Sequence, residues 1–427
     1  MGAPDPQARY QRLEASWARA AARFLPESAL DSPWRHSAAR LDDVPRQGWK
    51  LHLSATILTA GRLLRRAGPL LVARRIPFKG PSDLGFLDHL NAGLGGFSQV
   101  GKCLTVYCRD TEEAVMAAEE LHAATVGIAH PDVPFDLPYR RPSCVYYRYG
   151  AFDDRTMASR RGGRVGAIVD PDGRVVPDRR EPGFAVPKWM SDPFVEAGAN
   201  APESADSPLA VDYRAFDVLQ QRGKGGVYRA LDLTRAPARL CIIKEGLSHG
   251  ETDPDGRDGR WRVRHEARVL RALRRAGIAV PAVIAEFDVG GGRYLVLEHL
   301  EGETLGALTG AGRPLAPERC AGLVAALRKL IEDIHATGWA WRDCKPENIV
   351  MTADGDLRPL DFEGACRLDA PAAAPWSTPR YRAPLPSPGT PFDPVREDLH
   401  AVEVIAGEIH AAAGLTPRPG EIILSAG

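Results

Sequence analysis

Residues 341–348, WRDCKPEN, decide how the second half of the chain is interpreted. A second acidic motif, DFE at 361–363, follows them. Upstream lie Glu266, inside a helix-like run, and Lys244, at the end of a β-rich run. Earlier still, residues 222–228 hold several glycines between two β-rich runs. Features of these types in this order are hard to obtain by chance, so they predict one domain built around one site.

The glycine cluster consists of Gly223, Gly225 and Gly226. Glycine lets backbone N–H groups approach a phosphate closely, as a loop that covers a nucleotide must do. A cluster of this kind is as often a plain turn, so by itself it decides little. The motifs that follow it favour the nucleotide-binding interpretation.

This series resembles the protein kinase fold over about residues 212–427. By that resemblance Lys244 binds the α- and β-phosphates and is held by an ion pair to Glu266, while the three glycines cover the phosphates. The expected hinge includes Glu298 and Leu300, which offer backbone groups to adenine. The implied cofactors are ATP, or another nucleoside triphosphate, and Mg²⁺.

The catalytic roles implied by the resemblance belong to WRDCKPEN and DFE. Asp343 accepts the proton of the substrate hydroxyl, and Lys345 neutralises charge on the transferred phosphoryl group. Asn348 and Asp361 share the magnesium. The chain stops soon after the start of the central helix of the expected C-lobe, so we expect a shortened, minimal C-lobe.

Three residues depart from the usual kinase pattern. Tyr228 stands at the third glycine, Trp341 replaces the catalytic-loop histidine and Glu363 replaces the glycine of DFG. None of these changes removes the proposed base or a metal ligand. An inactive pseudokinase is therefore the weaker alternative.

Composition limits the class of protein. The chain has 427 residues, enough for two or three domains of about 150 residues. Lys plus Arg and Asp plus Glu each total 55, so zero net charge argues against binding to nucleic acid or membrane by bulk charge. Seven cysteines without a CxxC pair predict reduced thiols and no zinc site. With no signal-like or membrane-spanning run, we expect a cytoplasmic protein.

The first half alternates helix-like and strand-like segments, which predicts an α+β domain over residues 1–195. A small, polar, Pro-containing stretch predicts a linker over 196–211, and the second domain is expected over 212–427. The expected helices are 7–25, 55–74 and 111–124, and the expected strands are 49–54, 104–107 and 145–149, with a hairpin over 165–176.

Basic residues gather around the predicted strands of the first half. Lys50 and His52 lie two apart on one strand, so they share a face. An imidazole among cations is unfavourable unless an anion binds there, and a phosphorylated side chain brings about two negative charges. Such surroundings also lower the pKa of a lysine and make a neutral amine available as a base. Each residue taken singly is more often a surface charge. The other members of the group are Lys79, Lys102, Arg140, Arg141 and Arg148.

Four strings carry a second resemblance: GWKLHLSAT (48–56), FKG (78–80), VGKCLTVY (100–107) and VYYRYGAF (145–152). They resemble the phosphoserine/phosphothreonine lyase domain of class III lanthipeptide synthetases over about residues 40–195. The resemblance implies that Lys79 removes the α-proton of a phosphorylated Ser or Thr and that His52 protonates the leaving phosphate. The implied phosphate-binding residues are Lys50, Lys102, Arg140, Arg141 and Arg148.

Together the two resemblances imply one reaction sequence on a precursor peptide with a leader. The kinase phosphorylates Ser or Thr, and the lyase eliminates phosphate to leave dehydroalanine or dehydrobutyrine. Full-length family members add a cyclase, for which this sequence has no room, so a partner is expected to close the rings. By analogy the partner is a separate cyclase or a flavin-dependent cysteine decarboxylase. No nucleic acid or membrane partner is expected.

Two other functions compete with this one. A regulatory Ser/Thr kinase whose first half only docks substrate would make phosphopeptide as its final product. A non-enzymatic scaffold that binds a leader peptide would bind peptide without nucleotide and make no product.

Overall fold

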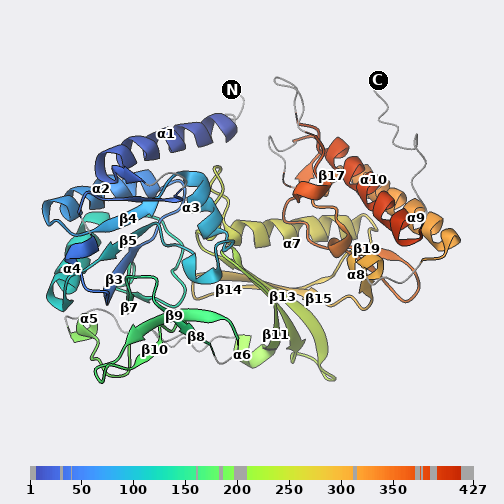
Figure 1. Ribbon diagram of the computed structural model, residues 1–427. Helices are drawn as coiled ribbons and strands as arrows, with labels where there is room; N and C mark the ends of the chain where they lie inside the picture. The colour runs from blue at the N-terminus through green and yellow to red at the C-terminus, as the bar shows by residue number, and fades with distance from the viewer. Residues whose placement is uncertain are drawn as a thin grey trace.

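The computed structural model describes residues 6–28, 32–39, 41–159, 162–181, 186–196, 209–310, 315–370, 376, 378–384 and 392–414. Helices and strands are mixed in both halves of the chain, which confirms the α+β prediction. Figure 1 shows the blue-to-green N-terminal half beside the yellow-green-to-red second half. Most of the predicted linker, residues 197–208, lies outside the described residues.

The first domain is built on a seven-stranded antiparallel sheet of order β1-β2-β4-β5-β3-β7-β6. Its strands are β1 (Glu27–Ser28), β2 (Trp34–His36), β3 (Gln47–Leu53), β4 (Phe78–Pro81), β5 (Leu104–Tyr107), β6 (Leu137–Pro138) and β7 (Val145–Ala151). Its helices are α1 (Pro6–Phe24), α2 (Ala60–Ala73), α3 (Leu84–Asn91), α4 (Thr111–Thr125) and α5 (Pro193–Glu196), with 3-10 turns η1 (Leu41–Asp43) and η2 (Phe97–Gln99).

Alternation along β3 separates the core of this domain from its polar face. Trp49, Leu51 and Leu53 are buried in one hydrophobic core with residues of α1 and α2. Because successive side chains of a strand point to opposite faces, the intervening Lys50 and His52 point away from that core. The helices therefore stabilise one side of β3 and leave the other for polar groups.

Helix α2 begins later than the sequence predicts. The expected start was residue 55, whereas the helix begins at Ala60. The hydroxyl of Thr59 accepts a hydrogen bond of 3.0 Å from the Thr56 amide. Such a local side-chain contact competes with helical hydrogen bonding, and apolar periodicity does not reveal it.

The predicted hairpin over 165–176 is confirmed as part of a three-stranded sheet of order β10-β9-β8. Val175 pairs with Val169 across the turn. This sheet contacts β7 through β9, beside the polar face of the larger sheet. Its strands are β8 (Thr156–Ala158), β9 (Arg164–Val169) and β10 (Val175–Pro177).

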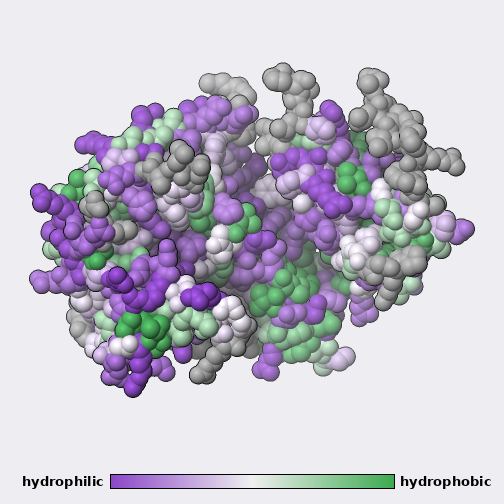
Figure 2. Space-filling view, viewed as in Figure 1, coloured by the Kyte–Doolittle hydropathy of each residue, from purple (hydrophilic) through white to green (hydrophobic). Residues whose placement is uncertain are grey.

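The second domain begins with helix α6 (Leu209–Asp212) and a five-stranded antiparallel sheet of order β11-β12-β13-β15-β14, against which α7 (Gly259–Arg275) packs. Apolar side chains of β11 are exposed, including Phe216 and Val218. Figure 2 shows a green area at the lower middle, over the region of this sheet. The strands are β11 (Tyr213–Arg222), β12 (Gly225–Asp232), β13 (Arg239–Leu247), β14 (Val283–Val289) and β15 (Gly292–Glu298).

The remainder of this domain is mainly helical, and its described core is formed largely by α9 (Pro317–Ala336) and α10 (Pro394–Ala412). Two small sheets, β16-β18-β19 and β17-β20, carry the loops of the predicted catalytic motifs. The other elements are α8 (Leu305–Gly310), β16 (Glu303–Thr304), β17 (Trp339–Ala340), β18 (Ile349–Met351), β19 (Leu357–Pro359), β20 (Cys366–Arg367), and 3-10 turns η3 (Pro346–Asn348) and η4 (Pro379–Tyr381).

The sequence analysis expected reduced thiols and no membrane-spanning segment. All seven cysteines are free and buried. Among the described residues, no helix has the length and apolar character needed to cross a membrane.

Candidate active sites

A cavity of about 320 Å³ opens on the polar face of the first domain. Strand register brings its residues together, because Lys50 on β3 lies opposite Arg148 on β7 and Tyr107 on β5. Lys79, on β4, lies opposite the same Thr105 that pairs with His52. Strands β3, β4 and β7 thus place Lys50, Lys79 and Arg148 around one space, and Lys102 lies just before β5. The predicted residues that line it are Lys50, His52, Lys79, Lys102 and Arg148.

A buried polar network around Asp136 adjoins this cavity through the lining residues His52 and Lys102. His52 Nδ1 lies 2.5 Å from one Asp136 oxygen, and Lys102 Nζ lies 3.3 Å from the other. Burial alone would raise the pKa of Asp136, but Lys102 and His52 lower it to about 2. Asp136 is therefore ionised at neutral pH and holds its two partners in place.

The same network keeps His52 neutral when no anion is bound. Burial and the charge of Lys102 lower the pKa of His52 to about 3. Because a carboxylate oxygen accepts a hydrogen bond, the neutral tautomer carries its proton on Nδ1 toward Asp136. His52 then presents an unprotonated Nε2 until an anion favours a second proton.

Arg148 is fixed by a second carboxylate. Its guanidinium lies 2.6 Å from Asp178, and both side chains are buried. Gly150 makes room for this pair, because a Cβ atom there would lie 2.5 Å from Arg148. The arginine is thus oriented before any substrate arrives.

Burial gives the lysines of the cavity unusual acidity. Burial and then Arg148 lower the pKa of Lys50 to about 7, and burial lowers that of Lys102 to about 8. Burial also lowers the pKa of Lys79, whose amine lies 4.1 Å from the centre of the Trp34 ring. A lysine with a lowered pKa supplies a neutral amine near neutral pH.

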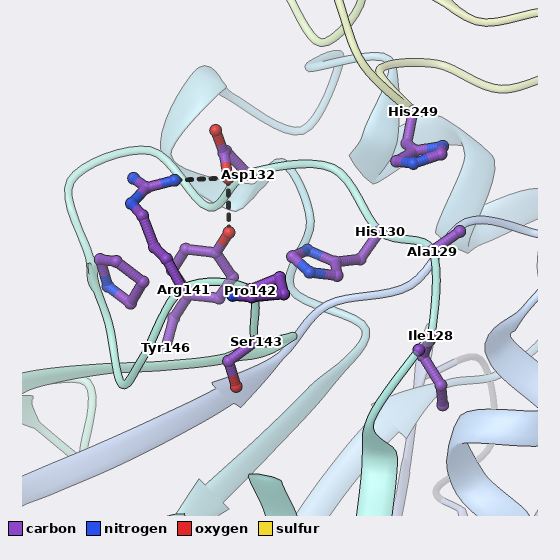
Figure 3. Close-up of a pocket in the computed structure, with 11 residues that line it drawn as sticks. Ile128, Ala129, His130, Asp132, Arg141, Pro142, Ser143, Tyr146 and His249 are labelled. Atoms are coloured by element: carbon purple, nitrogen blue, oxygen red, sulfur yellow. Dashed lines mark hydrogen bonds and ion pairs between the residues drawn. The ribbon is translucent and has the colours of Figure 1, made fainter. Parts of the chain in front are cut away.

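The structure does not bring Arg140 and Arg141 to this cavity. Arg140 pairs with Glu119 at 2.9 Å. Arg141 lies 3.9 Å from Asp132 in a different, larger cavity, where Figure 3 shows Asp132 between Arg141 and Tyr146. Adjacent basic residues in a loop gave no indication of which cavity they face, so the sequence grouped them wrongly with Arg148.

The sequence analysis missed several charged and aromatic residues of this site, among them Trp34, Asp178 and Arg180 in the cavity lining. It also missed Asp136, which contacts the lining residues His52 and Lys102. The acidic residues lie in loops rich in Pro and charge, where a carboxylate normally faces solvent. One signal could have revealed them. Several basic residues were predicted on neighbouring strands, and buried cations need carboxylates to balance their charge.

Sulfate, a dianion that does not titrate near neutral pH, tests this electrostatic account. Its charge raises the pKa of Lys50 and Lys102, so at pH 8 we expect uptake of about one proton per sulfate bound. Affinity should fall as pH rises above about 8, because the neutral amines must then be protonated on binding. Calorimetry in two buffers of different ionisation enthalpy measures the uptake, and Lys50→Met should reduce it. Equal heats in both buffers would contradict the account.

The second site lies in the other domain, between its sheet and α7. Lys244 on β13 contacts both oxygens of Glu266 on α7, at 2.7 and 2.8 Å, and lies 3.0 Å from Asp361. Burial alone would lower the pKa of Lys244, but Asp361 and Glu266 raise it. The predicted ion pair is present, and Lys244 carries its charge.

The WRDCKPEN motif forms a connected polar cluster. Lys345 Nζ donates to Asp343 at 2.7 Å, and Asn348 Nδ2 donates to the same carboxylate at 3.1 Å. Thr378 donates to the other Asp343 oxygen at 3.2 Å. Burial raises the pKa of Asp343, which favours proton acceptance. Thr378 was not predicted, because nothing in its sequence context ties it to Asp343.

Trp341, which stands in place of the usual histidine, forms hydrogen bonds with the backbone at the start of the DFE motif. Its indole N–H donates to the carbonyls of Leu360 and Asp361, at 3.1 and 3.0 Å. Asp361 itself has a positive φ of 60°, a conformation that costs free energy in a non-glycine residue. The indole contact holds the backbone at that strained position.

The magnesium ligands predicted from the sequence have suitable chemistry. Asn348 donates its hydrogen bonds through Nδ2, so Oδ1 is the atom it would offer to a cation. Burial alone would raise the pKa of Asp361, but Lys244 and then Lys224 lower it, so its carboxylate is ionised. Carboxylate and amide oxygens suit Mg²⁺, which also needs phosphate or water oxygens.

The remaining predicted residues surround the nucleotide side of this site. Gly225, Gly226, Lys244, Glu266 and Asp361 line one small cavity, whereas Gly223 forms the preceding turn. Glu298 ends β15, and its amide donates to the Ala282 carbonyl at 2.9 Å. Leu300 lies just after the end of β15, so both residues of the expected hinge stand at the end of this strand.

Two family models match the chain. One described as "RamC, N-terminal domain" matches residues 17–206, and one described as "Protein kinase domain" matches residues 218–398. The second domain is therefore a protein kinase domain, which implies ATP and typically Mg²⁺.

Curated relatives agree with both halves. The chain is 31% identical over 365 residues to the probable SapB synthase of Streptomyces coelicolor, covering 82% of this chain and 39% of that protein. It is 32% identical over 247 residues to the serine/threonine-protein kinase PknL of Mycobacterium tuberculosis, covering 54% of this chain and 56% of that kinase. The chain thus spans only part of the length of each relative. By its RamC N-terminal domain and the protein kinase domain that follows, the chain belongs to the class III lanthipeptide synthetases.

Proposed function

We propose that this protein is a bifunctional peptide dehydratase in lanthipeptide biosynthesis. The kinase domain transfers the γ-phosphoryl group of ATP to a Ser or Thr hydroxyl of a precursor peptide and releases ADP. The first domain then eliminates phosphate and leaves dehydroalanine or dehydrobutyrine. The observation that carries the proposal is the cavity of the first domain, where lysines of lowered pKa and a buried arginine surround His52.

In the elimination step, Lys79 removes the α-proton of the phosphorylated residue as a neutral amine. The Cα–H electron pair forms the Cα–Cβ double bond, and the Cβ–O bond breaks. Lys50, Lys102 and Arg148 bind the phosphate and stabilise the charge that develops on it. The sequence analysis had also placed Arg140 and Arg141 among the phosphate-binding residues, and the proposal leaves these two out.

His52 protonates the leaving phosphate. It is neutral in the empty cavity, but a bound phosphate dianion opposes the effect of Lys102 and raises the pKa of His52. Asp136 stabilises the resulting imidazolium through Nδ1. His52 is thereby protonated, and able to act as the general acid, only when a phosphate leaving group is bound.

In the phosphorylation step, Asp343 accepts the proton of the peptide hydroxyl, and Lys345 neutralises charge on the transferred group. Lys244 binds the nucleotide phosphates and is oriented by Glu266. Asn348 and Asp361 would hold Mg²⁺, which supplies charge neutralisation at the phosphates when bound. Glu298 and Leu300 position adenine through their backbone groups.

We propose that the substrate of the phosphorylation and elimination reactions is a precursor peptide with a leader. Thioether ring closure needs a cysteine thiol to add to each alkene, and we propose that a partner performs it, either a separate cyclase or a flavin-dependent cysteine decarboxylase. The buried free thiols suit a reducing compartment, and we propose that the protein works in the cytoplasm.

A synthetic phosphoserine peptide of the precursor sequence, incubated without nucleotide, tests the proposal. We expect release of inorganic phosphate and formation of dehydroalanine, because the lyase cavity needs no nucleotide. A phosphopeptide that stays intact would instead favour a regulatory kinase whose first domain docks substrate.

A further inference from the structure

The glycine loop of the kinase domain carries a lysine that the proposed mechanism does not use. Lys224 lies in the turn between β11 and β12, and its amine forms an ion pair with Glu363, the residue that replaces the glycine of DFG. The side chains are only 20% and 14% exposed. A lysine of the glycine loop and a departure from the common kinase sequence, Glu363, therefore meet as one largely buried contact.

This contact lies at the phosphate end of the nucleotide site. Lys224 and Glu363 line the same cavity as Lys244, Glu266 and Asp361. The cavity measures only about 30 Å³, whereas sites for ligands of drug size occupy roughly 300–1,000 Å³. The side chains must rearrange before triphosphate can enter.

The backbone of the turn is held on its other side by the first domain. The Gly223 amide donates to the Ala92 carbonyl at 3.2 Å, and a Cβ atom at Gly223 would lie 1.6 Å from the Asn91 carbonyl oxygen. The Lys224 carbonyl also accepts from the Leu247 amide at 2.8 Å. Since the backbone is anchored, the long lysine side chain is the part free to change partner.

The charges around Lys224 favour such an exchange. Glu363 and Asp361 both attract its amine, whereas nearby Arg262 repels it. A triphosphate would bring negative charge beside Glu363 and offer Lys224 oxygens that are equally good partners. The incoming phosphates and Glu363 therefore compete for one cation.

We propose that Lys224 is an additional phosphate-binding residue of the kinase site and that Glu363 is its partner when nucleotide is absent. Nucleotide binding then exchanges the Glu363 carboxylate for a phosphate. This inference rests on the proposed kinase function and adds to it a residue that sets nucleotide affinity.

Direct titration with a fluorescent ATP analogue and Mg²⁺ tests the exchange. Glu363→Gln keeps the shape of the side chain but removes its charge, so we expect the Kd to fall about tenfold. Lys224→Met should raise the Kd about tenfold, because it removes the cation and leaves Glu363 facing the phosphates. In the double variant, Glu363→Gln should give a smaller gain than it gives alone, since its main benefit acts through Lys224.

Matched controls come from an exposed ion pair on α9, Lys329 with Asp333 at 2.9 Å. Lys329→Met and Asp333→Asn should leave the Kd unchanged, and melting temperatures show whether every variant is folded. An unchanged or raised Kd in folded Glu363→Gln, or an unchanged Kd in Lys224→Met, overturns the exchange. A wild-type protein that binds no nucleotide contradicts the kinase function itself and the exchange with it.

Discussion

Asp343→Asn is expected to abolish phosphorylation of the precursor peptide and to leave elimination intact. The substitution keeps the size of the side chain but removes the carboxylate that accepts the hydroxyl proton. Loss of a general base costs roughly a hundred- to ten-thousandfold in rate. Transfer of radiolabelled phosphate from ATP to the peptide measures the first effect, and phosphate release from synthetic phosphopeptide measures the second.

The matched control for this variant is Asp333→Asn, on the exposed side of α9. It should retain both activities. Rapid phosphorylation by Asp343→Asn would show that the carboxylate is not the base. Loss of both activities in a folded Asp343→Asn protein would contradict the assignment of the two steps to separate sites.

Lys79→Ala is expected to produce the opposite pattern, with phosphopeptide accumulating in the presence of ATP. Without the amine the proposed base is missing, and elimination should slow by roughly a hundred- to ten-thousandfold. Phosphorylation should continue, because Lys79 lies in the other domain. Mass spectrometry of the peptide at successive times distinguishes the phosphorylated from the dehydrated form.

The exposed Lys188 provides a matched control, and Lys188→Ala should dehydrate the peptide at the wild-type rate. If Lys79→Ala also dehydrates at that rate, another group is the base. Lys50 is then the next candidate, because it lines the same cavity and, with no anion bound, its pKa is lowered to about 7.

The kinase half was the more predictable from sequence because its chemistry follows a fixed order of short motifs. The resemblance to the kinase fold implied the ion pair between Lys244 and Glu266, and the structure joins Lys244 to Glu266 and to Asp361 by contacts of 3.0 Å or less. The sequence showed which residues depart from the kinase pattern, but it could not show which contacts those residues make. The indole of Trp341 and the Lys224–Glu363 pair depend on side-chain directions across distant loops.

The first domain was less predictable, since its site is assembled by strand register. Alternation along one strand placed Lys50 with His52, and pairing with β7 added Arg148. No local pattern distinguishes Asp136, which balances these cations from a loop, or separates Arg141 from Arg148. Loop carboxylates and adjacent arginines acquire their roles only through the tertiary fold.

The most direct measurement is the mass of the precursor peptide after incubation with wild-type protein, ATP and Mg²⁺. The account predicts loss of water at Ser or Thr residues, with the phosphorylated form as a transient intermediate and thiol addition confirming the alkene. A peptide that gains phosphate and never loses water would contradict it.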